Sequence, residues 1–271
     1  MITKLFSWIL AGVFMLSPFV ASAEYGIYYG TSQKYASKTI GFNTMIIQPY
    51  NIGLYENYTG KKICYLTVGE FDGTADELKT LGLDSSKVGF NETWNSFIMD
   101  MSSIKRQEYL IKEELKLKNM GCNGLFLDTI WQDGQQEGGI QIVKKMRENW
   151  KEAYIIPNNA HFIRYDILGY INAFMFENFW ETKTTVGSED ALWLEEQMQE
   201  YQKLVKGTNV RLMAISYGNP FVTRNKAWAI KAGQLSLKYG FEQIYTNTYL
   251  TNIYGYVSVS NRSIKKLPGV K

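Results

Sequence analysis

The sequence predicts a single-domain α/β protein, a (β/α)8 or TIM barrel with one accessory strand to spare. Short runs rich in Val, Ile, Tyr and Phe recur between longer segments of helical periodicity, which is typical of parallel strands joined by crossover helices. Several of these runs are apolar throughout, as expected where helices cover one face of a sheet and packed side chains fill the other. Without its leader the chain has about 250 residues, the usual size of such a barrel.

The first 23 residues have the composition of a secretory signal peptide. Lys4 supplies a positive start, residues 5–16 an apolar run, and Ala-Ser-Ala at 21–23 a small-residue cleavage site. A membrane anchor is the alternative, but the apolar run is shorter than the ~20 residues of a spanning helix and Pro18 interrupts its end. We therefore expect cleavage before Glu24, a secreted or periplasmic location, and no stable membrane association afterwards.

Nine runs qualify as strands, one more than the barrel needs, so one of them is accessory or wrong. They are residues 25–29, 44–48, 62–68, 96–99, 124–127, 153–157, 171–176, 210–215 and 241–245. We expect the barrel to occupy residues 24–260 and to be followed by a polar, basic tail at 261–271.

The expected helices are clearest toward the C-terminus. Apolar residues recur at helical spacing across 194–205 and 228–239, and more weakly across 111–115 and 142–150. Gly121, Gly207 and Gly240 follow such segments, at positions where a left-handed C-cap favours glycine. Strand, helix, glycine and strand in succession is the order of an α/β fold.

The composition limits the partners and the chemistry. The net charge of +3 is nearly balanced and no basic stripe is visible, so we expect no nucleic-acid partner. We also expect a monomer. His161 is the only histidine, which excludes a three-histidine zinc site, and we expect neither metal nor cofactor. Cys64 and Cys122 lie in or beside apolar runs; two buried free thiols are the favoured interpretation, and a disulfide is the alternative.

Four apolar runs end in a carboxylate, namely Glu70, Asp100, Asp128 and Glu177. Because charge is costly to bury inside a barrel, such acids belong at its mouth, and parallel strands deliver their C-terminal ends to one rim. Convergent carboxylates without a thiol or histidine nucleophile suit glycoside hydrolysis, where one acid stays protonated and the other ionised. Taken singly, each acid could instead cap a helix.

Aromatic and amide side chains near the same strand ends complete the candidate site. The aromatic rings would face sugar rings and the amides would contact hydroxyl or acetamido groups. These candidates are Tyr28, Trp131, Asn158, Asn159, Trp180 and Tyr217.

Several motifs together resemble glycoside hydrolase family 114. They are residues 65–70 (YLTVGE), Trp94 with Asp100, residues 121–128 (GCNGLFLD), residues 157–159 (PNN) and residues 176–178 (FEN), which occur in the family's order across nearly the whole mature chain. That family comprises (β/α)8-barrel endo-α-1,4-polygalactosaminidases and is related to the hydrolase domain of Pel-polysaccharide proteins. The chain departs from the family pattern at Thr129, where asparagine or aspartate is frequent, and at Ala160, where glycine is common.

The resemblance implies roles for the candidate residues. Asp128 would be the nucleophile or its equivalent and Glu177 the general acid/base, while Glu70, Asp100 and Asn159 would bind substrate or tune that pair. The substrate would be an α-1,4-linked galactosamine or N-acetylgalactosamine polymer.

Two other functions fit the sequence. A non-catalytic carbohydrate-binding barrel in exopolysaccharide export or adhesion would need the same fold, although it would not need two acids of opposed protonation. A metal-dependent hydrolase or deacetylase would use Asp and Asn ligands and would be sensitive to a chelator.

Overall fold

The structure is a computed structural model that describes residues 24–181, 184–258 and 263–267. The expected signal peptide, residues 1–23, lies outside the described residues. Among the described residues, every helix is too short or too polar to traverse a bilayer.

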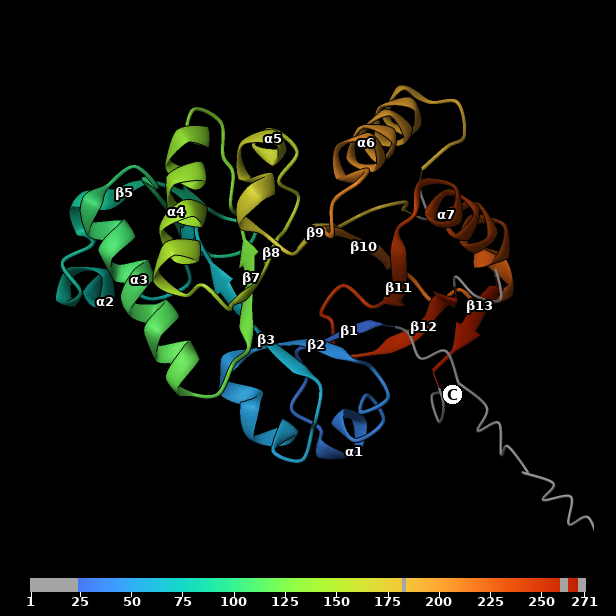
Figure 1. The fold of residues 1–271 in the computed structure, drawn as a ribbon, viewed down its shortest axis with the longest axis horizontal. Helices are drawn as coiled ribbons and strands as arrows, with labels where there is room; N and C mark the ends of the chain where they lie inside the picture. Colours follow the sequence, from blue (N-terminus) through green and yellow to red (C-terminus); the bar gives the residue numbers. More distant parts are fainter. Residues whose placement is uncertain (1–23, 182–183, 259–262, 268–271) are drawn as a thin grey trace, which may run out of the picture.

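Eight parallel strands form the barrel (Figure 1). One hydrogen-bonded sheet has the order β1 (Tyr25–Tyr28), β2 (Thr44–Ile47), β3 (Lys61–Thr67), β7 (Gly124–Asp128) and β8 (Tyr154–Pro157). A second sheet contributes β9 (Ala173–Phe176), β10 (Arg211–Tyr217) and β11 (Glu242–Thr246). A parallel bridge between Asn158 and Met175 joins β8 to β9, and Tyr29 N donates to Leu250 O where the segment after β11 returns to β1. The expected fold class is therefore confirmed.

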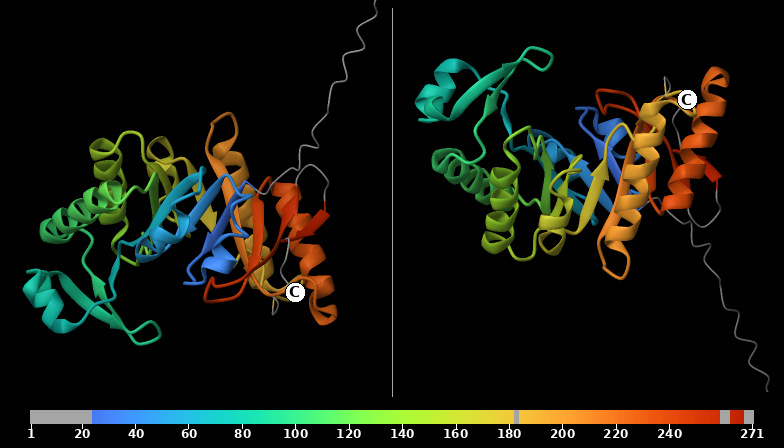
Figure 2. Two further views of the ribbon diagram at one scale, coloured as in Figure 1. Left: turned by 90° about the horizontal axis from the view of Figure 1, so that it is seen from below. Right: turned by 90° about the horizontal axis from the view of Figure 1, so that it is seen from above.

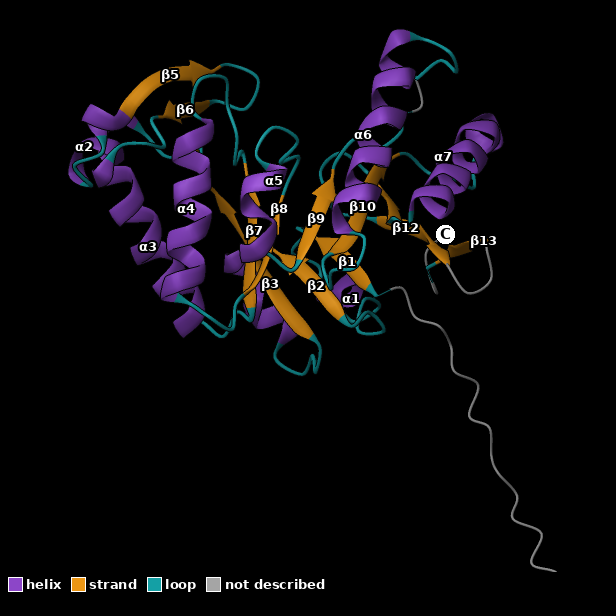
Figure 3. Cartoon of the chain, turned by 45° about the horizontal axis from the view of Figure 1, so that its top comes forward, coloured by secondary structure: helices purple, strands orange, loops and turns teal. Residues whose placement is uncertain are grey.

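Helices cover the outside of the strands (Figure 3). The longer ones are α3 (Ile104–Asn119), α4 (Gln136–Asn149), α6 (Glu189–Val205) and α7 (Lys226–Tyr239). Shorter turns are α1 (Gln33–Ala36), η1 (Pro49–Tyr55), α5 (Arg164–Ile167), η3 (Leu168–Tyr170) and η4 (Thr223–Asn225). The helix α7 ends as expected at Gly240, whose φ of 78° is the left-handed conformation that glycine adopts without strain.

A β-hairpin takes the place of a helix after the last barrel strand. Its strands, β12 (Ile253–Ser258) and β13 (Ser263–Lys266), pair antiparallel with each other, and β12 pairs antiparallel with β11. The expected loose tail at 261–271 is therefore wrong for Ser263–Lys266, because these residues complete a sheet edge. Residues 261, 262 and 268–271 lie outside the described part of the chain.

An insertion between β3 and α3 projects from one side of the barrel (Figure 2). It contains β4 (Glu70–Phe71), α2 (Ala75–Thr80), η2 (Asp84–Ser86), β5 (Lys87–Asn91) and β6 (Ser96–Met99). The strands form an antiparallel sheet of order β4-β6-β5 with a small apolar core of its own. The expected barrel strand at 96–99 is thus the surplus one, since it belongs to this insertion.

The alternation of side chains along the strands positions the functional site. Ile27, Ile63, Phe126, Met175 and Ile215 all belong to the cluster that fills the barrel interior. Because successive side chains point to opposite faces of a strand, the residue two positions later points inward again, one layer nearer the C-terminal mouth. That layer consists of Tyr29, Tyr65, Asp128, Glu177 and Tyr217.

Cys64 and Cys122 form a disulfide, with a Cα–Cα distance of 5.9 Å. The expectation of free thiols is therefore wrong. Cys64 lies on β3 and Cys122 just before β7, and these strands are neighbours in the barrel although they are far apart in sequence. Such pairing depends on which strands are adjacent, which the composition around each cysteine does not reveal.

Replacing both cysteines with alanine is expected to lower the free energy of unfolding by about 2–4 kcal/mol, because the link closes a long loop in the unfolded chain. The sequence separation is 58 residues. Urea unfolding of the oxidised wild type and the double variant measures the difference. Equal midpoints, together with two titratable thiols in the native wild type, would contradict the assignment.

A buried carboxyl group makes the stability depend on pH. Glu114 on α3 is 0% exposed, accepts a hydrogen bond from Asn149 Nδ2, and has its pKa raised to about 7 by burial. The native protein therefore holds this proton more tightly than the unfolded chain does. The contribution of protonated Glu114 to the free energy of unfolding is present at low pH and is lost as pH rises through about 7.

Glu114→Gln is accordingly expected to raise Tm at pH 8 and to have little effect at pH 5. A gain in the free energy of unfolding on the order of 1–2 kcal/mol corresponds to a rise in Tm of roughly 2–8 °C for a domain of this size. Calorimetry at the two pH values tests this, with the exposed Glu148→Gln on α4 as control. A gain at pH 5 that equals the gain at pH 8 would contradict the ionisation argument.

Candidate active site

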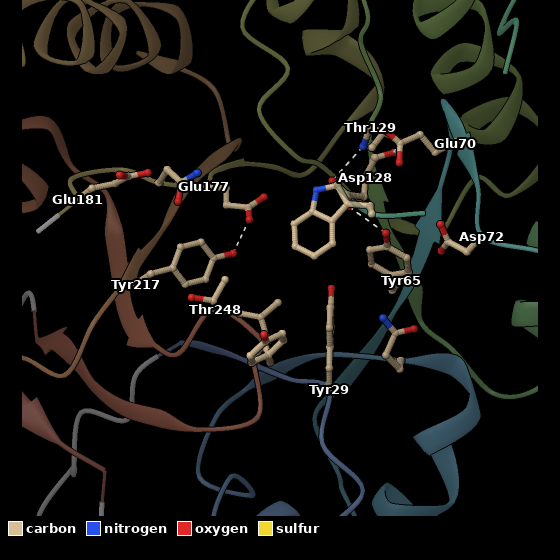
Figure 4. Close-up of a pocket in the computed structure, with 15 residues that line it drawn as sticks. Tyr29, Tyr65, Glu70, Asp72, Asp128, Thr129, Glu177, Glu181, Tyr217 and Thr248 are labelled. Atoms are coloured by element: carbon tan, nitrogen blue, oxygen red, sulfur yellow. Dashed lines mark hydrogen bonds between the residues drawn. The ribbon is translucent and has the colours of Figure 1, made fainter. Parts of the chain in front are cut away.

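A cavity of about 690 Å³ opens at the C-terminal ends of the barrel strands (Figure 4). Its lining, as far as the described residues show it, is rich in acidic and aromatic side chains and contains no Lys, Arg or His. The lining residues are Tyr29, Gln48, Tyr65, Glu70, Asp72, Trp94, Asp128, Thr129, Glu177, Asn178, Glu181, Tyr217, Thr248, Tyr249 and Leu250.

Asp128 ends β7, and donors surround its carboxylate. Tyr65 Oη donates to Oδ2 at 2.9 Å, and Asn158 Nδ2 and the Thr129 backbone N each donate to Oδ1 at 2.9 Å. Hydrogen bonds to an ionised acceptor are stronger than those between neutral groups, so the three donors stabilise negative charge here. They also fix the orientation of the carboxylate toward the cavity.

Glu177 follows β9 on the other side of the cavity (Figure 4). Tyr217 Oη donates to Oε1, and Asn158 Nδ2 donates to Oε2 at 2.5 Å. Burial raises the pKa of this carboxyl group, the negative charge of Asp128 raises it further, and the two hydrogen bonds lower it in part. Glu177 is therefore the member of the pair that retains a proton more readily.

One amide group connects the two acids. Asn158 follows β8, the strand between those that carry Asp128 and Glu177, and its side chain is 3% exposed. Its Nδ2 contacts both carboxylates, whereas its buried Oδ1 accepts no hydrogen bond from the described residues. Because one nitrogen contacts both, through hydrogen bonds of 2.9 and 2.5 Å, the two acceptor oxygens lie at most 5.4 Å apart. This upper limit favours the ~5–5.5 Å spacing of retaining glycosidases over the ~6.5–9.5 Å of inverting ones.

The residues that directly follow Asp128, Asn158 and Glu177 have a left-handed backbone. The φ angles of Thr129, Asn159 and Asn178 are 51°, 46° and 55°. Asparagine tolerates this region, but a β-branched threonine does so only under strain. The Thr129 hydroxyl contacts Thr67 Oγ1 and accepts from Gly69 N, each at 3.0 Å, which holds the turn in place.

Among the candidates for substrate contact, four neither line the cavity nor form a hydrogen bond with Asp128 or Glu177 in the described part of the chain: Asp100, Trp131, Trp180 and Tyr28. Asp100 follows the accessory strand and accepts hydrogen bonds from Ser102 at the start of α3. Trp131 packs on Phe162 outside the cavity lining. Trp180 and Tyr28 are 1% and 2% exposed, because both belong to the core under the helices.

The remaining candidates divide by role. Tyr217 lines the cavity and contacts Glu177. Asn159 Oδ1 accepts from Glu177 N at 2.9 Å, so its side chain holds the backbone of β9 instead of facing the cavity. Glu70 lines the cavity, but both of its oxygens accept hydrogen bonds from the insertion.

The sequence interpretation did not assign Tyr65 or Trp94 to the cavity. Tyr65 lies within an apolar strand run, and only the inward alternation from Ile63 would have identified it. Trp94 lies in the turn between β5 and β6 and reaches the cavity from the insertion. No local sequence pattern shows that the insertion lies beside the mouth of the barrel. Asp72 adds a carboxyl group whose pKa is raised by burial and by the charges of Glu70 and Asp128.

Tyr217→Phe is expected to move the alkaline limb of the pH profile of kcat/KM to higher pH. The phenol lowers the pKa of Glu177, so its removal lets Glu177 keep its proton longer. Kinetics from pH 4 to 9 on a galactosamine polymer, the substrate that the sequence resemblance implies, measures the limb. A limb that moves to lower pH, or does not move, would contradict the assignment of this limb to Glu177.

The fold and the cavity together define a (β/α)8-barrel protein with two facing carboxylates at the C-terminal mouth. No family model matches the sequence, and no curated protein does.

Solved structures share the fold. The glycoside hydrolase domain of PelA from Pseudomonas aeruginosa is similar with a TM-score of 0.69 and 20% identity, over 85% of this chain and 96% of that one. Aspergillus fumigatus Ega3 in complex with galactosamine has a TM-score of 0.61 and 15% identity, over 86% and 94%. TtGalA, an α-galactosidase from Thermus thermophilus, has a TM-score of 0.60 and 10% identity, over 82% and 57%. The resemblance expected from the motifs is thus confirmed at the level of the fold.

Proposed function

We propose that the protein is a secreted glycoside hydrolase that cleaves an α-1,4-linked galactosamine or N-acetylgalactosamine polymer with Asp128 and Glu177. The observation that carries the proposal is the single Asn158 amide that contacts both carboxylates across one cavity. Two acids at this spacing, with the pKa of one of them raised, are what a retaining hydrolysis requires.

The reaction would proceed in two steps. Glu177 donates its proton to the glycosidic oxygen while Asp128 attacks the anomeric carbon, so the bond to the leaving saccharide breaks and a glycosyl ester forms. Glu177, now ionised, then takes a proton from water, which attacks the same carbon and releases Asp128. The product keeps the anomeric configuration of the substrate, and Glu177 regains its proton.

The choice of substrate rests on charge and on the neighbours in fold. Within the described part of the chain, five carboxyl groups line the cavity without a basic side chain among them, an arrangement that attracts a cationic, partly deacetylated amino-sugar polymer. One neighbour was solved in complex with galactosamine and another is a PelA glycoside hydrolase domain. The leader at residues 1–23 supports export to the compartment where such polymers occur.

The test is product analysis after incubation with galactosaminogalactan, Pel and chitosan-type polymers. New reducing ends and shorter oligosaccharides from the first two are the expected result, without inhibition by EDTA. Loss of activity with EDTA would instead favour the metal-dependent hydrolase. Tight polymer retention without any product would favour the carbohydrate-binding barrel.

A further inference from the structure

The turn that carries Trp94 is the part of the cavity that does not come from the barrel. Trp94 lies between β5 and β6, is 63% exposed, and lines the same cavity as Asp128 and Glu177. A large apolar ring is thereby held in water at the edge of a strongly acidic site. Neither the barrel strands nor the two catalytic carboxylates need it for their own packing.

The carboxylate of Glu70 fastens this turn at its base. Asn91 Nδ2 donates to Oε1 at 2.9 Å and Ser96 Oγ donates to Oε2 at 2.6 Å. Asn91 and Ser96 are paired across β5 and β6, so they are the two ends of the turn that carries Trp94. The side chain of Glu70, 8% exposed, thus joins both legs of the hairpin and has its two oxygens occupied.

The segment that carries Glu70 is itself fixed to the barrel. Arg106 on α3 is 1% exposed, and its Nη2 donates to the carbonyl oxygens of Thr67, Val68 and Glu70 at 3.1, 2.8 and 2.6 Å. These hydrogen bonds tie the end of β3 to the start of the insertion. Hydrogen bonds of Arg106 and Glu70 therefore link the turn that carries Trp94 to the end of β3. A surface turn without a function would not need to be held in this way.

We propose that Trp94 is the platform on which a sugar ring of the bound polymer stacks, and that Glu70 is a positioning residue that holds this platform. The C–H face of a pyranose ring is apolar, and an exposed indole offers it a matching flat surface beside polar groups that fix orientation. The inference rests on the proposed function, because it names where the polymer binds beside the cleaved bond.

Steady-state kinetics on the polymer tests the platform. Trp94→Ala is expected to raise KM about tenfold or more with a smaller change in kcat, because stacking away from the reacting atoms contributes alike to the ground and transition states. Trp94→Phe, which keeps a smaller ring, should lie between. Val88→Ala, exposed on β5 but outside the cavity, is the matched control. A KM for Trp94→Ala within twofold of wild type would overturn the platform.

A double-mutant cycle tests the role of Glu70. Glu70→Ala removes the acceptors of both Asn91 Nδ2 and Ser96 Oγ and should raise KM in the wild-type background. In the Trp94→Ala background the same change should add less than about twofold, because the platform that it positions is gone. Independent, multiplicative effects would mean that Glu70 binds substrate itself and would overturn its positioning role. Asp84→Asn, at an exposed acid of the insertion outside the cavity, should leave both backgrounds unchanged.

Binding without turnover separates this inference from the proposed function. Intrinsic tryptophan fluorescence of the Asp128→Asn protein should change on addition of the polymer, and the change should disappear in Asp128→Asn with Trp94→Phe. If wild type forms no products from any polymer, the proposed function fails, while a polymer-dependent signal from Trp94 would still support the platform. If wild type is active and the signal does not depend on Trp94, only the platform fails.

Discussion

Glu177→Gln is expected to lower kcat on the polymer by about 10³-fold or more, and Asp128→Asn by at least as much. The amide that replaces the carboxyl group of Glu177 cannot protonate the leaving oxygen, a contribution that general acid catalysis places at about 10²–10⁴-fold. The amide that replaces the carboxylate of Asp128 cannot form the glycosyl ester, so the first step loses its nucleophile. Reducing-end assays under saturating polymer measure both variants.

Two controls make this result specific. Asp133→Asn replaces an exposed acid that follows β7 but does not line the cavity, and it should retain wild-type activity. Polymer binding by Glu177→Gln should persist, because the substitution removes a proton donor and not the cavity. Activity of either catalytic-site variant within tenfold of wild type would contradict the two-carboxylate mechanism.

Asn158→Ala is expected to lower kcat about 10²-fold with little change in KM. The amide orients both carboxylates, and small displacements of reacting groups are costly at this level. The same variant should move the alkaline limb of the pH profile upward, because the hydrogen bond from Asn158 lowers the pKa of Glu177. If the loss of activity came only from misfolding, the remaining activity would show its alkaline limb at the same pH as the wild type.

A conservative series sharpens this test. Asn158→Asp keeps the size of the side chain but places a third carboxyl group against Asp128 and Glu177, so it should not restore activity. Thermal unfolding of each variant separates stability from kinetics. Wild-type kcat in Asn158→Ala would show that the bridge between the two acids has no part in the reaction.

Much of the barrel could be predicted because its signal is local. Apolar runs and helical spacing placed the barrel strands within a few residues, and the acids that end β7 and β9 were found because a charge after a buried run is expensive. The sequence does not show that the run at 96–99 is the accessory one of the nine, since an apolar strand in a small separate sheet has the same pattern as a barrel strand. Likewise, the disulfide depends on which strands are neighbours, and no local pattern encodes that.

The aromatic residues show the same limit within the site. Tyr28 and Tyr29 are adjacent in sequence, yet one packs under the helices and the other lines the cavity, because alternate strand residues face opposite sides. Applying that alternation selects Tyr29 over Tyr28 and adds Tyr65. It would not have found Trp94, whose place depends on how the insertion folds back over the barrel mouth.

The central claim is that Glu177 holds a proton because it is buried opposite a charged Asp128. A ¹³C-detected NMR titration of the Glu177 side-chain carboxyl in the wild type and in Asp128→Asn measures this directly. We expect a titration midpoint above the ordinary glutamate value of about 4.3, and a lower midpoint once the negative charge of Asp128 is removed. A Glu177 that titrates at or below the ordinary value in the wild type, or that does not respond to Asp128→Asn, would contradict it.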